Sequence, residues 1–280
     1  MEYKREPAAR SPGVYLDEEM DLTELSQLLG RTLFIVAHPD DESISAGGLL
    51  QHMREPCVVF VTDGAPEDQY FWGRYGSRHA YAAIREKEAR DALAAVGVKQ
   101  AEFIARKGET SLIDQKLFTA LPLAFAALSE IVDRVRPTCL LTLAYEGGHP
   151  DHDAVSFLGA QLGAAFRLPI WETPLYHRSS NGSGVYQAFV EEHGEVIEHL
   201  VKDSELDAKM RMLGCYKSQF DALPSFRPEL ERFRPQAHYN YGRRPHAGKL
   251  NYEHWQWPMT PEEVCAAFAK FSPAGEPVKR

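Results

Sequence analysis

Short apolar runs alternate with longer amphipathic segments along the first 170 residues. Apolar runs of this length are typical of buried strands, and they occur at 31–37, 57–62, 101–105 and 138–144. Segments with apolar residues at helical spacing predict helices at 41–54, 81–96, 118–134 and 151–166. Strands that alternate with helices form parallel sheets with crossover helices on their faces. The pattern therefore predicts an α/β fold, a Rossmann-like three-layer sandwich around a mostly parallel sheet.

The pattern changes after residue 170. Brief apolar stretches predict shorter strands at 175–176, 184–190 and 196–201, and a helix at 205–213. Residues 221–260 are rich in Pro, Arg, Tyr, His and Trp and predict long loops. We therefore expect an arm with a short helix over 1–30 and a single domain over 31–280. That domain would divide into a core, 31–170, and a C-terminal antiparallel and loop extension, 171–280.

Composition limits the classes of partner. The chain of 280 residues carries 31 basic and 40 acidic residues, a net charge of −9, which argues against a phosphate-binding surface for nucleic acid. No run of about 18 apolar residues is present, so we expect no membrane-spanning helix. Residues 1–10 are charged and lack the apolar region of a signal peptide, so we expect a cytoplasmic protein.

A first cluster of chemically active residues directly follows the first predicted strand. It contains His38, Asp40, Asp41 and Glu42. One imidazole and three carboxylates this close together are unfavourable unless positive charge neutralises them. A helix N-terminus supplies part of that charge, and a divalent metal would supply far more. Taken alone, the segment also fits an ordinary helix start with acidic capping residues.

A second cluster follows the fourth predicted strand and contains His149, Asp151, His152 and Asp153. Taken alone, it fits a polar surface loop equally well. The carboxyl ends of parallel strands share one edge of a sheet, so the two clusters can face each other. Two histidines and an aspartate suit a catalytic zinc, which takes three protein ligands and keeps one position open. The same donors would also accept iron or cobalt.

The two motifs together resemble a known family. The sequence AHPDDE at 37–42, followed by HPDH at 149–152, is similar to the LmbE-like, or PIG-L, family of zinc-dependent N-deacetylases. Further similarity lies at 61–64, 85–89, 209–219 and 231–234, so the resemblance covers residues 31 to about 235. It implies removal of an acetyl group from an N-acetylglucosamine-type substrate, a small acetylated amino sugar, with one Zn²⁺ per chain.

The resemblance also implies a role for each motif residue. His38, Asp41 and His152 would be the zinc ligands, and Asp40 would be the general base. His149 would be the cation that stabilises the tetrahedral oxyanion.

Asp151 would orient His149, as carboxylates beside catalytic imidazoles commonly do. Some family members carry an aromatic hydroxyl two residues before the first histidine of the second motif. Here that position is Gly147, and the nearest tyrosine is Tyr145. The resemblance therefore does not imply a tyrosine role in this chain.

Candidate substrate contacts lie outside the motifs. Arg85 could contact a substrate hydroxyl or phosphate, or form an ordinary exposed ion pair on its helix. Trp72 and Tyr75 could stack on a sugar face, or serve ordinary packing. They belong to an aromatic and basic loop at 66–78, and a second such loop spans 236–258. Either loop could bind substrate or a neighbouring subunit of a homo-oligomer.

Two other functions are compatible with parts of the sequence. A zinc amidase acting on a larger amide, such as a sugar–thiol conjugate, would use the same metal site. A nucleotide-dependent enzyme or a non-catalytic sugar-binding protein would not need it. The first strand is followed by HPDDE rather than by the glycine-rich fingerprint of dinucleotide sites, and acidic groups there would repel a pyrophosphate.

Overall fold

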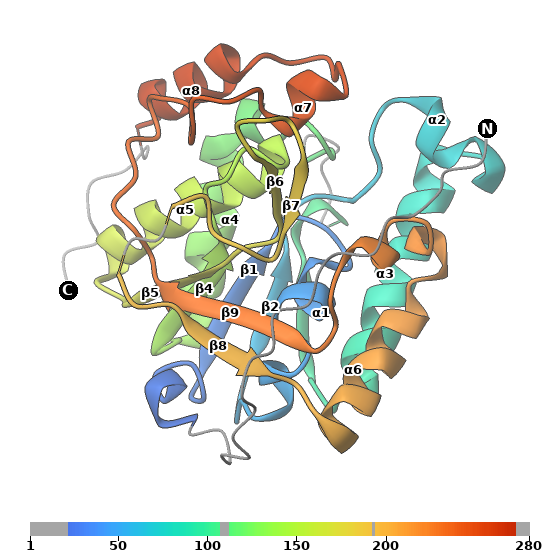
Figure 1. The fold of residues 1–280 in the computed structure, drawn as a ribbon, viewed down its shortest axis with the longest axis vertical. Coiled ribbons are helices and arrows are strands. Elements are labelled where there is room, and N and C mark those ends of the chain that lie inside the picture. Colours follow the sequence, from blue (N-terminus) through green and yellow to red (C-terminus); the bar gives the residue numbers. More distant parts are fainter. Residues whose placement is uncertain (1–21, 107–111, 192–193, 273–280) are drawn as a thin grey trace.

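The computed structural model describes residues 22–106, 112–191 and 194–272. Its centre is a seven-stranded sheet with the strand order β3-β2-β1-β4-β5-β9-β8 (Figure 1). The strands are β1 Thr32–Val36, β2 Cys57–Phe60, β3 Gln100–Phe103, β4 Cys139–Leu143, β5 Ile170–Thr173, β8 Ile197–Leu200 and β9 Leu230–Pro235. A separate antiparallel pair is formed by β6 Tyr176–Arg178 and β7 Gly184–Tyr186.

The first five strands of the sheet are parallel. β1 pairs with β2 on one side and with β4 on the other, and β3 and β5 extend the parallel arrangement outward. Every residue of β1 and β4 is buried, as expected for central strands covered on both faces. β9 runs antiparallel to both β5 and β8. The α/β class, the mostly parallel sheet and the antiparallel C-terminal extension are thus confirmed.

Helices cover both faces of the sheet. Figure 1 shows α4 and α5 on one side and α3 and α6 on the other. The helices are α1 Asp41–Ala46, α2 Gln69–Trp72, α3 Arg78–Ala95, α4 Leu121–Val135, α5 Pro150–Phe166, α6 Asp203–Cys215, α7 Asn251–His254 and α8 Pro261–Lys270. One continuous apolar cluster includes residues of the core and of the extension, such as Leu33 and Phe233. Strands from beyond residue 170 therefore enlarge the first sheet.

The structure differs from the sequence prediction at several elements. β5 and β9 were not predicted, because each carries a charged residue inside the sheet: Glu172 of β5 accepts a hydrogen bond from Arg234 of β9 at 2.7 Å. The helix predicted at 41–54 ends at Ala46, and a 3₁₀ turn, Leu49–Gln51, follows. The two predicted loops contain the short helices α2 and α7, and α8 was not predicted.

Gly48 allows a close contact just beyond the end of α1. A Cβ on Gly48 would lie 2.5 Å from a methyl group of Val201, so only glycine allows the chain to approach this closely. The backbone N–H groups of Gly48 and Leu49 then donate to the carboxylate of Glu231 in β9, at 2.6 and 3.0 Å. The first cluster is thereby fixed against the end of the sheet.

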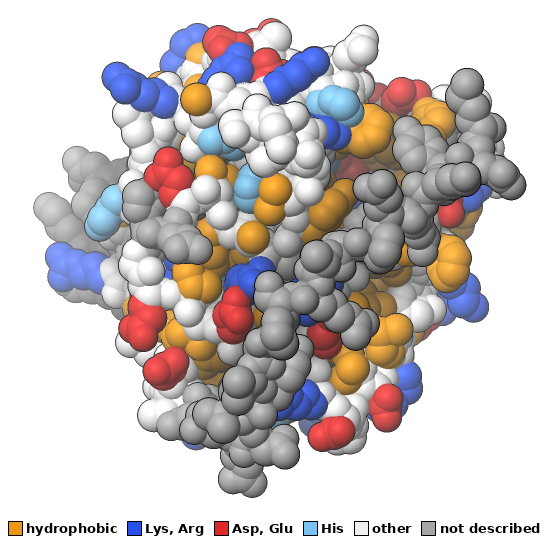
Figure 2. Space-filling view, in the orientation of Figure 1, with side chains coloured by type: hydrophobic (Ala, Val, Ile, Leu, Met, Phe, Trp, Pro, Cys, Tyr) orange, Lys and Arg blue, Asp and Glu red, His pale blue; other side chains and the backbone are white. Residues whose placement is uncertain are grey.

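The surface has no helix suited to a membrane. Among the described residues, no helix is both long enough and apolar enough to cross a bilayer. On the face shown in Figure 2, acidic and basic side chains of the described residues are interspersed.

Candidate metal centre and active site

The two sequence motifs meet at one edge of the sheet. β1 ends at Val36 and β4 at Leu143, and these two strands are parallel neighbours. The loop after β1 leads into α1 and carries His38. The loop after β4 leads into α5, whose first turn carries His152. The order of strands therefore brings together side chains more than a hundred residues apart in the sequence.

Three possible ligand atoms face one another there. His152 Nε2 lies 3.3 Å from His38 Nδ1 and 3.3 Å from Asp41 Oδ1. His38 Nδ1 lies 3.6 Å from the other Asp41 oxygen. All three side chains are at least 95% buried. Two imidazole nitrogens and a carboxylate oxygen are a donor set that zinc binds readily, and the residues present fit that ion.

His38 is oriented by carboxylates on its far side. Its Nε2 shares a 3.2 Å hydrogen bond with Asp151 and lies 3.2 Å from Asp114. A proton on Nε2 leaves Nδ1, the atom that faces His152 and Asp41, with its lone pair free. Metal-binding histidines are held in this way in proteins. Burial would lower the pKa of His38, but Asp114, Asp151 and Asp41 together raise it well above its ordinary value.

Asp41 is fixed by the backbone around it. One carboxylate oxygen accepts hydrogen bonds from the N–H groups of Ala37 and His38, at 3.1 and 2.8 Å. Burial would raise the pKa of Asp41, but the neighbouring His152 and His38 lower it to about 2. The group is therefore a carboxylate at neutral pH, as metal binding requires.

Asp40 is held in an unfavourable backbone conformation. Its φ is 119°, a region that residues other than glycine rarely adopt. Arg85 secures it by donating to the carbonyl of Pro39 at 2.6 Å and to the Asp40 carboxylate at 3.1 Å. The N–H of Asp40 donates to Glu42 at 3.2 Å. Burial raises the pKa of Asp40 to about 7, although the charge of Arg85 opposes the shift.

Arg85 is buried, so the exposed ion pair expected from sequence is wrong, while a contact with substrate stays a prediction. It is 5% exposed, and its guanidinium also donates to the carbonyl of Gly64 at 2.6 Å. It forms no exposed ion pair with Glu88, which instead accepts hydrogen bonds from Ser218. These contacts hold Arg85 against Asp40 and the loop that carries it.

His149 lies on the open side of the cluster. The N–H of Asp151 donates to His149 Nδ1 at 3.1 Å, which places the ring proton on Nε2. Nε2 lies 3.3 Å from Asp114, and the ring packs against Trp257 with centroids 4.8 Å apart. Burial, followed by the charge of His38, lowers the pKa of His149. His149 thus presents a hydrogen-bond donor at Nε2, and its expected role as a cation stays a prediction.

The carboxylate of Asp151 also differs from its expected role. It lies 4.0 Å from His149 Nδ1 and contacts His38 instead. The backbone N–H groups of Gln115 and Leu117 donate to it at 2.7 and 2.9 Å. The side chain that faces His149 Nε2 is Asp114.

Sequence reasoning missed Asp114 because it belongs to no motif. It lies beyond β3, on the edge that also carries the two clusters. Its neighbours His38 and His149 hold its pKa well below the ordinary value, against the effect of burial. No spacing or motif in the sequence indicated its contact with the two clusters.

Some side chains of the aromatic loop at 66–78 pack against neighbouring residues, and others line a cavity. Trp72 donates to the carbonyl of Pro66 at 3.1 Å, and Tyr75 stacks on Tyr81 with centroids 4.8 Å apart. Neither Trp72 nor Tyr75 lines the large cavity beside the site, whereas Tyr70 and Phe71 of the same loop do.

Tyr145 points away from the cluster. Its hydroxyl donates to the carbonyl of Arg243 at 2.7 Å, and its ring packs against Tyr239 and Tyr241. Another tyrosine, Tyr176 of β6, packs its ring against His152 with centroids 5.4 Å apart. No motif or spacing in the sequence predicted that contact.

A model of the PIG-L family, described as GlcNAc-PI de-N-acetylase, matches residues 33–162. This range contains both motifs and every residue of the clustered site. Over this range the chain is similar to the PIG-L family. Its relatives include a probable N-acetyl-alpha-D-glucosaminyl L-malate deacetylase 2 of Bacillus cereus, 28% identical over 201 residues, with 68% of this chain and 84% of that protein covered.

A second relative is the 1D-myo-inositol 2-acetamido-2-deoxy-alpha-D-glucopyranoside deacetylase of a Mycobacterium species. It is 31% identical over 194 residues, which cover 61% of each chain. Among solved structures, a triple mutant of a deacetylase of the teicoplanin biosynthetic pathway has a TM-score of 0.56 at 23% identity, with 69% of this chain and 84% of that chain covered. The zinc-inhibited form of teicoplanin deacetylase also has a TM-score of 0.56, at 19% identity, covering 73% and 97%. The two structural likenesses show that the chain shares the fold of these deacetylases.

Proposed function

We propose that this protein is a member of the PIG-L family and a zinc-dependent hydrolase that removes the acetyl group from an N-acetylglucosamine-type substrate, giving acetate and a free amine. The observation that carries the proposal is the convergence of His38 Nδ1, Asp41 and His152 Nε2 within 3.3–3.6 Å of one another. The deacetylases named among its relatives support the choice of an acetylated amino sugar.

His38, Asp41 and His152 would hold the zinc. When bound, zinc lowers the pKa of a coordinated water and polarises the amide carbonyl. The buried carboxylates of Asp114 and Asp151 keep the free ring nitrogen of His38 directed at that point. Three protein ligands, with a fourth position left for water, are typical of catalytic rather than structural zinc sites.

Asp40 would move the proton. It is adjacent to Asp41, yet its carboxylate is bound by Arg85, so the two aspartates can serve different roles. Asp40 takes a proton from the attacking water and passes it to the departing amine. A rigid position suits this task, because proton transfer requires the base within hydrogen-bonding reach of both atoms.

His149 would donate a hydrogen bond to the developing oxyanion. Its ring proton is on Nε2, and this nitrogen faces Asp114. Donors fixed before the reaction stabilise the transition state more than they stabilise the substrate.

The proposal is tested by analysing products. We expect the purified protein to release acetate and a primary amine in equal amounts from N-acetylglucosaminyl compounds. Asp40→Asn should lower kcat by about 10²–10⁴-fold, the usual contribution of a general base, while metal content stays unchanged. Asp207→Asn, the same change at an exposed position on α6, should have no effect.

Full activity of Asp40→Asn would refute the base assignment. Release of a larger acid in place of acetate would favour the alternative, a zinc amidase acting on a sugar conjugate.

A further inference from the structure

A large cavity opens directly beside the clustered residues. Its volume is about 1070 Å³, and its lining includes Asp114, which contacts His38 and His149, and Trp257, which packs on His149. Cavities of about 300–1,000 Å³ bind ligands of drug size. An N-acetylated hexosamine placed with its amide at the cluster would leave much of this volume for the group attached to the sugar.

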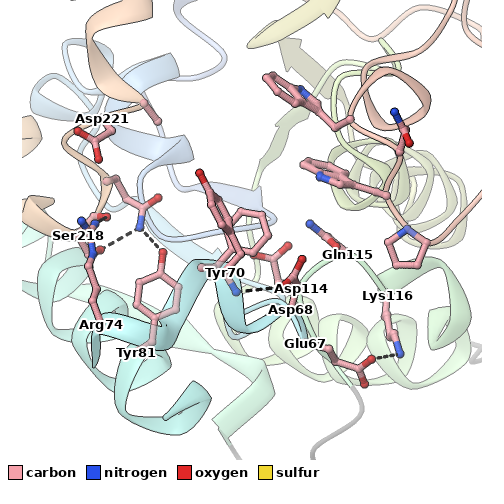
Figure 3. A pocket seen from close by; sticks show the side chains of 17 residues that line it. Glu67, Asp68, Tyr70, Arg74, Tyr81, Asp114, Gln115, Lys116, Ser218 and Asp221 are labelled. Atoms are coloured by element: carbon pink, nitrogen blue, oxygen red, sulfur yellow. Dashed lines mark hydrogen bonds and ion pairs between the residues drawn. The ribbon is translucent and has the colours of Figure 1, made fainter. Parts of the chain in front are cut away.

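Five aromatic side chains line this cavity. Tyr70 and Trp255 are 85% and 57% exposed, although rings of this size are usually covered. Phe71, Tyr81 and Trp257 line the same cavity. In the view of Figure 3, Tyr70 stands in the middle of the cavity. Exposed rings gathered around one hollow offer flat apolar surfaces to a ligand.

The charges in the cavity disfavour an anion. The described residues that line it include four carboxylates, Glu67, Asp68, Asp114 and Asp221, and two cations, Arg74 and Lys116. Both cations are already engaged. Lys116 pairs with Glu67, while Arg74 donates to the carbonyl of Ser218 and lies over the ring of Tyr75.

Asp221 lies on the opposite wall from Lys116 in Figure 3 and makes no hydrogen bond or ion pair with any described residue. A negatively charged group entering here would meet more carboxylates than cations in the described lining.

We propose that the substrate carries, beyond its N-acetylated sugar, a bulky aromatic aglycone without negative charge. This inference rests on the deacetylase function proposed above and specifies its substrate class. It separates this protein from the Bacillus cereus relative, whose name specifies an L-malate aglycone, because malate carries carboxylates. The rings of Tyr70, Phe71 and Trp255 would stack on the aglycone, and Asp221 would repel anionic alternatives.

Matched glycosides test the proposal. The compounds are free N-acetylglucosamine and its phenyl, 2-naphthyl, 4-carbamoylphenyl and 4-carboxyphenyl glycosides, in both anomers. We expect kcat/KM to rise about tenfold from the free sugar to the naphthyl glycoside, the scale of added aromatic contacts. The carbamoylphenyl glycoside should exceed its carboxyphenyl counterpart several-fold, although the two differ mainly in charge.

Binding supplies a readout that does not need turnover. The same compounds are titrated into the Asp40→Asn variant while quenching of tryptophan fluorescence is followed, and the same order of affinities is expected. Absence of turnover with the expected order of binding would count against the deacetylase function and support the aglycone preference. Equal binding of free sugar and naphthyl glycoside, or preference for the carboxylate, would overturn the inference.

Two variants test which side chains produce the preference for an aromatic, uncharged aglycone. Trp255→Ala should reduce the ratio of naphthyl to phenyl affinity. Asp221→Lys should raise the ratio of carboxyphenyl to carbamoylphenyl affinity roughly two- to fivefold, the scale of an exposed ion pair. The matched control is Asp207→Lys, which makes the same charge change on α6 and should leave both ratios unchanged. If Asp221→Lys behaves like this control, Asp221 has no part in selection.

Discussion

At the scale of single residues, the site depends on groups that hold others in place. Asp40 has a φ of 119°, and such a conformation persists only when its surroundings enforce it. Arg85 supplies three of the enforcing contacts, to Pro39, Asp40 and Gly64. We therefore assign Arg85 to positioning Asp40 and its loop.

This assignment predicts the kinetics of Arg85→Lys. A lysine ammonium cannot span the acceptors that the planar guanidinium reaches at once. We expect kcat to fall about 10²-fold, because misplacement of a reacting group by about 1 Å has an effect of that size, with KM nearly unchanged. Arg90→Lys, an exposed pair partner of Glu86 on the same helix, is the control.

The opposite kinetic pattern would support the first interpretation of Arg85, a contact with the substrate. A rise in KM with kcat unchanged would mean that Arg85 contacts the substrate directly.

The motif residues were identifiable from sequence because each set is contiguous. HPDDE and HPDH concentrate incompatible charges in a few positions, and such a pattern has few structural explanations. Asp114 and Tyr176 were not identifiable, because each is a single residue brought to the site by the course of the chain. The partner of Asp151 was also missed, since spacing along a helix does not determine which of two histidines a carboxylate faces.

At the scale of elements, a buried ion pair connects the extension to the core. Lys209 of α6 lies 2.7 Å from Glu231 of β9, and both side chains are fully buried. Lys209 also donates to the carbonyl of Ile44, and Glu231 accepts from the N–H groups of Gly48 and Leu49. The pair therefore anchors the segment that follows the first motif.

Removing the cation should destabilise the whole protein. Lys209→Met leaves the carboxylate of Glu231 buried without its partner, which costs about 3–5 kcal/mol. Urea unfolding should show a correspondingly lower midpoint. Lys87→Met breaks an exposed pair with Asp91 on α3 and should change stability by less than about 0.5 kcal/mol. Equal effects of the two substitutions would show that the buried pair is not a structural anchor.

The parallel strands were predictable because central strands read as unbroken apolar runs. β5 and β9 were not, because the pair Glu172–Arg234 places charges inside the sheet. Only the folded sheet, in which β9 runs beside β5, neutralises these charges. The short helices α2 and α7 lie in segments without helical periodicity, so pattern alone predicted loops there.

At the scale of the whole molecule, strand order creates the site. β1 and β4 are far apart in the sequence and adjacent in the sheet, so their following loops form one cluster at one edge. The α/β class and that edge were predictable, since ligands of parallel sheets gather at the carboxyl ends of strands. The cavity was not predictable from sequence, because the residues that line it come from separate segments of the chain.

Metal analysis combined with activity is the most direct test. We expect about one zinc per chain in the wild type and in His79→Ala, an exposed control on α3. His152→Ala should lose both the metal and the deacetylase activity. Treatment of the wild type with a chelator should abolish acetate release, and added Zn²⁺ should restore it. Full activity after complete removal of metal, or His152→Ala that keeps both metal and activity, would contradict the account.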